Sequence, residues 1–141
     1  MRSMSPSEWR AFLLGNTRTA KLATVRADGR PHVAPVWFDL DGDELIFTTS
    51  TESAKGKNIL RDPRVMISVD DEHPPFAFVS IEGTAIAVEN SEHLLFWTTR
   101  LARRYMGNER ADAYGKRNAG PGELLIRVPL TKIVAQQDVA G

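Results

Sequence analysis

The sequence predicts an α+β protein that is mainly β, with antiparallel strands and a few short helices. Six segments have the alternating pattern of strands: 21–26, 32–39, 44–49, 65–69, 76–88 and 123–134. The first three are joined by Asp28-Gly29 and Asp41-Gly42, which are typical of tight hairpin turns. Six mostly antiparallel strands with small peripheral helices predict a small closed or split β-barrel.

The helical segments are short and have clear boundary signals. Ser5-Pro6-Ser7-Glu8 predicts a capping box at the start of an opening helix, which Gly15 ends. Further helices are expected at 54–61, 91–105 and 109–117. With 141 residues and no linker or repeat, the chain is expected to form one domain, 1–141.

Two residues inside predicted strands indicate irregularity. Pro35 cannot donate a backbone hydrogen bond, which favours an edge or an opening in the ladder. Gly83 predicts a bulge or bend in the long strand 76–88.

Composition excludes several functions. The 18 basic and 18 acidic residues give a net charge of zero, so no bulk attraction to nucleic acid is expected, and Arg100, Arg103 and Arg104 are expected to lie solvated on helix faces. The absence of Cys excludes a thiol nucleophile, a disulfide and an iron–sulfur cluster. The apolar stretches are too short for a signal peptide or a membrane span, so a cytoplasmic protein without a membrane partner is expected.

No self-sufficient catalytic or metal-binding motif is present. His32, His73 and His93 lack the spacing of a metal site. The acidic segment 39–44 resembles the start of a calcium loop, but Ser50 falls where the bidentate Glu is required. We therefore expect no bound metal and no catalytic side chain, and a cofactor would carry any chemistry.

The segment Ser53-Ala54-Lys55-Gly56-Lys57-Asn58 is unusual for a helix start. Cations in the first turn oppose the helix dipole, and Gly56 weakens the helix. A bound anion would reverse the first effect, with backbone N–H groups, both lysines and a hydroxyl around a phosphate and Gly56 permitting close approach. The alternative is a solvated basic helix end.

Hydroxyl side chains end the strand that precedes this helix. Thr48, Thr49 and Ser50 lie where small-molecule sites are often built, although, taken alone, they are better explained as a polar strand end.

Three segments together resemble the pyridoxamine 5′-phosphate oxidase-like flavin-binding split barrels. They are residues 24–38, with Pro31-His32 and Pro35-Val36-Trp37-Phe38, the segment Ala54 to Val65, and Val79 to Ala85. The resemblance spans about residues 8 to 135 and is nearest to the branch that uses coenzyme F420, a deazaflavin. The substrate-phosphate motif of the oxidase itself is missing, so pyridoxamine phosphate oxidation is not expected.

The resemblance implies a six-stranded antiparallel split barrel that forms a homodimer with two cofactor sites at its interface. By position, the phosphate and the start of the acidic tail would be held by Ser53, Lys55, Lys57 and Asn58. The ribityl chain and ring would lie against Thr48, Thr49 and Ser50. The pyrimidine edge would meet Pro35, Val36 and Trp37, with His32 nearby.

Some positions depart from the relatives. Phe76 and Phe78 stand where relatives often carry Trp or Tyr facing the partner's site, which implies a more apolar substrate pocket. Ser53 stands where some relatives carry Arg.

The implied activity is an F420-dependent oxidoreductase that transfers a hydride to a small conjugated or quinone-like acceptor. An FMN-binding oxidoreductase of the same fold is the alternative, since FMN also carries a terminal phosphate. A non-catalytic F420- or FMN-binding protein is the third possibility, because the sequence identifies no proton donor.

Overall fold

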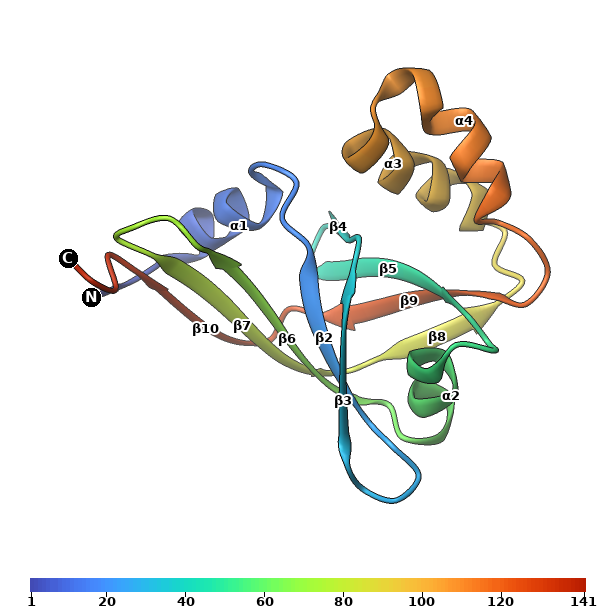
Figure 1. The fold of residues 1–141 in the computed structure, drawn as a ribbon, viewed down its shortest axis with the longest axis horizontal. Coiled ribbons are helices and arrows are strands. Elements are labelled where there is room, and N and C mark those ends of the chain that lie inside the picture. Colours follow the sequence, from blue (N-terminus) through green and yellow to red (C-terminus); the bar gives the residue numbers. More distant parts are fainter.

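The computed structural model describes residues 1–141 and contains two antiparallel β-sheets (Figure 1). The large sheet has six strands in the order β1-β10-β7-β6-β2-β3, and the small sheet has four in the order β4-β5-β9-β8. The strands of the large sheet are β1 (Arg2–Ser3), β2 (Ala20–Val25), β3 (Pro31–Val36), β6 (Arg64–Asp71), β7 (Ala77–Thr84) and β10 (Lys132–Gln137). Those of the small sheet are β4 (Asp39–Asp41), β5 (Glu44–Ser50), β8 (Ile86–Glu89) and β9 (Glu123–Pro129).

Four helices lie around the sheets: α1 (Pro6–Leu14), α2 (Ala54–Arg61), α3 (Leu94–Met106) and α4 (Asn108–Arg117). The predicted capping box of α1 is confirmed, because Ser5 and Glu8 cap each other reciprocally. Backbone and side-chain hydrogen bonds from Ser5 and Gln137 lower the pKa of Glu8 to about 2. The helix expected from Ser91 begins at Leu94 instead. No helix in the protein has both the length and the apolar character that crossing a bilayer requires.

The expected split barrel is wrong in its count of six strands, and its strands form two separate sheets instead of one closed barrel. Three predicted strands each break and pass from one sheet to the other, giving β3 and β4, β7 and β8, and β9 and β10. The alternation of apolar and polar residues along the sequence cannot reveal these breaks, because the alternation continues where the chain changes its hydrogen-bonding partner strands. The barrel is therefore split into two sheets, and the short β1 adds an edge strand.

Gly83 does not form the predicted bulge, since it remains paired with Val65 inside β7. A Cβ atom at this position would lie 2.7 Å from Cγ1 of Val128 on β9. The glycine therefore allows the two sheets to approach closely where β7 passes β9.

The core fills the space between the two sheets. Leu22, Ile67 and Ile81 of the large sheet meet Phe47 and Ile126 of the small one, and all five are fully buried. A second, smaller cluster lies on the other face of the small sheet, where α3 packs Leu94 and Trp97 against Ile46 and Leu125. The α3–α4 hairpin thus stands over β5 and β9 (Figure 1).

Two of the three arginines of α3 also bind groups on other elements, although 51% of the Arg100 side chain stays exposed. Arg100 donates through Nε to the buried carboxylate of Asp39 at 2.9 Å. Arg104 donates to the carbonyls of Phe38 and Leu13 at 2.6 and 2.8 Å. These charged hydrogen bonds connect α3 to the β3–β4 link and to α1, and only Arg103 projects freely into solvent.

Candidate functional site

A pocket of about 300 Å³ opens where β5 and β9 meet the helices. Its walls come from five places: the link after β3, the end of β5, the first turn of α2, the middle of α3, and the segment from the end of α4 to β9. The lining residues are Pro35, Val36, Trp37, Thr48, Thr49, Ser50, Lys55, Thr98, Leu101, Asn118 and Glu123. Seven of these eleven are among the thirteen site residues expected from sequence.

The register of β5 and β9 determines which side chains enter this pocket. Ser50 lies opposite Glu123, and Thr48 lies opposite Leu125. Directly opposed residues share one face of a sheet, so Thr48, Ser50 and Glu123 lie on the face that α3 covers through Leu125. The polar pocket therefore lies on the same face of the small sheet, next to the apolar contact between α3 and Leu125.

Trp37 forms one wall and is held by α3. Its ring stacks on Tyr105, with centroids 5.2 Å apart and planes 2° from parallel. The Tyr105 hydroxyl donates to the carbonyl of Arg18 at 2.7 Å and accepts from the backbone N–H of Phe38 at 3.3 Å. Burial raises the pKa of Tyr105, so the phenol stays protonated and keeps this donor.

Ser53 is the N-cap of α2. Its hydroxyl accepts from the N–H of Gly56 at 3.0 Å and also contacts the Thr49 hydroxyl at 2.7 Å and the Ser50 carbonyl at 2.9 Å. One hydroxyl has one donor and two acceptor sites, so these contacts use its full capacity. In this conformation Ser53 positions the helix start and has no free site for a phosphate.

Gly56 serves packing, which differs from its expected role beside an anion. A Cβ atom here would lie 2.0 Å from the backbone oxygen of Ser50. The missing side chain therefore lets α2 lie directly against the end of β5.

The two lysines of α2 point to different places. Lys55 lines the pocket, whereas Nζ of Lys57 lies 3.8 Å from the Glu52 carboxylate with 60% of its side chain exposed. Residues two apart on a helix do not share a face, which explains the separation. A joint role for both lysines at one anion stays a prediction.

Asn58 of α2 and His32 of β3 are not among the residues that line the pocket. Asn58 donates to the Thr24 hydroxyl at 3.0 Å and accepts from Arg61, so its side chain joins α2 to β2. His32 lies opposite Thr24 on β3, and its buried Nδ1 has no hydrogen-bond partner. An orphaned ring nitrogen leaves His32 able to bind a further group.

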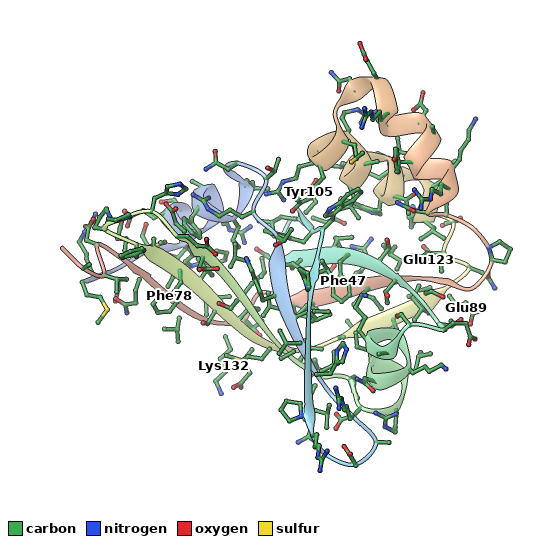
Figure 2. All side chains as sticks on the ribbon, viewed as in Figure 1. Phe47, Phe78, Glu89, Tyr105, Glu123 and Lys132 are labelled. Carbon is green, nitrogen blue, oxygen red and sulfur yellow. The ribbon has the colours of Figure 1, made fainter.

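Phe76 and Phe78 lie at the far end of the large sheet, and Figure 2 shows Phe78 well away from Glu123. They line a small cavity with Asp70 and Val139. Within one chain they do not reach the pocket, and their expected place at a partner's site stays a prediction.

Glu123 is the main site residue that sequence reasoning missed. Burial raises the pKa of its carboxyl, while a hydrogen bond from Thr48 and the positive charge of Lys55 oppose that rise. Thr98, Leu101 and Asn118 also enter the pocket from α3 and the end of α4. A Glu at the start of a strand carries no sequence signal for a site, because only the long-range pairing with Ser50 brings it there.

The donor set suits a phosphorylated, hydroxyl-bearing ligand with a planar ring. Lys55 offers an ammonium group, and the hydroxyls of Thr48 and Ser50 can donate or accept. Trp37 offers an aromatic wall. The volume is at the small end for a ligand pocket, which fits a site that holds part of a larger molecule.

Two sheets that exchange strands, with a polar pocket at the end of the smaller sheet, define this protein as a split β-barrel. Residues 5–134 match the family model described as Pyridoxamine 5′-phosphate oxidase, and the chain belongs to that family.

Solved structures agree with this assignment. The conserved hypothetical protein Rv2991 from Mycobacterium tuberculosis superposes with a TM-score of 0.84 at 27% identity, covering 96% of this chain and 86% of that one. A structure named F420 Reductase has 30% identity and a TM-score of 0.70, covering 87% of this chain and 94% of that one. The heme storage protein HutZ from Vibrio cholerae has a TM-score of 0.72, covers 96% of each chain and, at 23% identity, shows the fold alone.

Gly56→Ala is predicted to destabilise the protein by about 1–3 kcal/mol, because the new Cβ atom would collide with the backbone of Ser50. In a helix without this contact the same change would stabilise by up to about 1 kcal/mol. Urea unfolding measures the difference. Gly120→Ala is the control, since nothing lies within 4 Å of a Cβ atom there. A neutral or stabilising Gly56→Ala would show that α2 does not pack as described.

Proposed function

We propose that this protein is an F420-dependent reductase acting on a small conjugated or quinone-like acceptor. The observation that carries the proposal is the pocket itself, in which Lys55, Thr48 and Ser50 surround a space walled by Trp37. The 30% identity to a structure named F420 Reductase supports the deazaflavin over other cofactors.

The residues of the pocket would bind and orient the cofactor. Lys55 would neutralise its phosphate, and the free N–H groups of the first turn of α2 would add partial positive charge. Thr48 and Ser50 would hydrogen-bond the polyol chain, and the backbone beside Pro35 and Trp37 would meet the edge of the ring. When bound, the reduced deazaflavin supplies the hydride. The protein supplies position and the exclusion of water.

An FMN-dependent oxidoreductase is the alternative, because FMN presents the same phosphate and polyol to the same side chains. A binding protein without turnover would use them too. Cofactor preference distinguishes the F420-dependent reductase from the FMN-dependent oxidoreductase. Hydride transfer to an acceptor distinguishes both enzymes from the binding protein.

The apoprotein is predicted to bind coenzyme F420 more tightly than FMN. Parallel titrations followed by the fluorescence of each cofactor measure the two dissociation constants. The reverse preference would favour the FMN alternative, and binding of neither cofactor would contradict the proposed function.

Lys55→Ala is predicted to weaken cofactor binding by at least about tenfold, since a hydrogen bond to a charged group is worth about 1.5–3 kcal/mol. Lys57→Ala is the matched control on the same helix turn, and its effect should be smaller because its side chain lies toward Glu52. The same fluorescence titration reads both variants. Equal losses would restore the joint role of the two lysines, and no loss in either would remove the phosphate from this position.

We also propose that the protein is a homodimer that pairs through the outer face of its large sheet. No helix covers this face, and Val33, Met66 and Val134 on it are 63%, 43% and 56% exposed. A cavity of about 790 Å³ opens on the same face between β2, β6 and β7. Phe78 lies on this face as well, so pairing would carry it toward the second chain.

Met66→Lys is predicted to shift the protein toward monomer, because a charge would be buried in the interface. Glu82 lies opposite position 66 and would accept the lysine in the free chain, so folding should be kept. Sedimentation velocity over a range of concentrations measures the shift. Leu95→Lys, an equally apolar exposed position on α3, is the control. An unchanged oligomer in the Met66 variant would contradict this interface.

A further inference from the structure

Glu123 conflicts in charge with the ligand expected in its pocket. It and Lys55 are the two ionisable side chains among the lining residues. A carboxylate can only accept hydrogen bonds, so a phosphate held by Lys55 would bring two acceptors of like charge together.

The groups around Glu123 come from every wall of the pocket. Lys55 approaches from α2, and Thr48 donates a hydrogen bond from β5. The residues contributed by α3 and the end of α4, namely Thr98, Leu101 and Asn118, are neutral. Lys55 is therefore the only cationic side chain in the pocket that can offset the charge of Glu123.

We propose that Glu123 determines the ligand specificity of this pocket, admitting anions that present a hydroxyl beside their charged group and rejecting bare anions. This inference rests on the proposed function, in that both use the same pocket. A polyol hydroxyl donates to the Glu123 carboxylate while the adjacent phosphate lies on Lys55. A ligand with no donor leaves the two negative charges opposed.

A bare anion binds more tightly when Glu123 takes up a proton. The protonated carboxyl becomes a donor, and the repulsion disappears. Burial already raises the pKa of this carboxyl, and a bound anion raises it further. Proton uptake on binding means that affinity for a bare anion falls as pH rises through the pKa of the free site, and the fall ends above the pKa of the bound site.

Inorganic sulfate and FMN are suitable probes. Sulfate stays a dianion across the pH range and has no donor, whereas FMN carries ribityl hydroxyls beside its phosphate. Sulfate binding is followed by the backbone amide shifts of residues 53–56 in NMR spectra, and FMN binding by its fluorescence, each at pH 5.5 and pH 7.5. The proteins compared are the wild type, Glu123→Gln and Glu89→Gln. Glu89 is an exposed carboxylate on β8 of the same sheet (Figure 2).

The wild type and Glu89→Gln should bind sulfate more weakly at the higher pH, by up to about a hundredfold, which is the limit for the uptake of one proton over two pH units. Glu123→Gln should bind sulfate at both pH values with little change. For FMN, the same variant should gain no affinity, because the neutral amide oxygen of Gln accepts the ribityl hydroxyls more weakly than the carboxylate does. Sulfate binding by Glu123→Gln that falls with pH as in the wild type would overturn the inference.

The remaining outcomes separate the two proposals. Binding of FMN or F420 together with a pH-independent sulfate affinity in the wild type would overturn the specificity role alone. Binding of no anion and neither cofactor would overturn both. If Glu123→Gln does not fold, calorimetry of sulfate binding to the wild type in two buffers of different ionisation enthalpy decides, since uptake of a proton supports the inference and no uptake overturns it.

Discussion

The antiparallel ladder between β5 and β9 is the constraint on which the candidate site depends. It runs without a break from the pairing of Glu44 with Pro129 to that of Ser50 with Glu123. One face of the ladder supplies Phe47 and Ile126 to the main core, and the other carries the α3–α4 hairpin. A slip of one residue would exchange these faces, putting hydroxyls into the core and apolar groups into the pocket. Core packing therefore fixes the geometry of the site.

Local signals in the sequence were sufficient for the parts of the fold that depend on neighbours along the chain. The capping box at Ser5 and Glu8 is confirmed because it is made within four residues. The exchange of strands between sheets was not predictable in this way. At Ala85, the backbone N–H leaves the ladder to reach the carbonyl of Pro63, a partner that alternation does not reveal. The same reasoning applies to Arg104, whose carbonyl partners lie far away in the sequence.

The candidate site shows the same division. Thr48, Ser50 and Lys55 could be proposed from their places at a strand end and a helix start, and they line one pocket. Gly56 illustrates what local reasoning misses. A glycine is needed there because the backbone carbonyl of Ser50 lies too close for a side chain, and not because a ligand approaches. Glu123 could not be proposed at all, since its relevance arises only from pairing with Ser50 across more than seventy positions of the chain.

The opposition of Lys55 and Glu123 gives the pocket a property that neither residue has alone. A pocket with only a lysine would attract any anion that fits, because Coulomb attraction does not distinguish phosphate esters from sulfate. A carboxylate in the same pocket repels every anion and so cancels that general attraction. Only ligands that also donate a hydrogen bond to the carboxylate recover the lost affinity. Its partial burial strengthens the effect, since a half-buried charge is screened less by solvent and salt than an exposed one. Discrimination against the abundant small anions of a cell would then arise from repulsion, and affinity for a polyol phosphate from attraction, within a space of about 300 Å³.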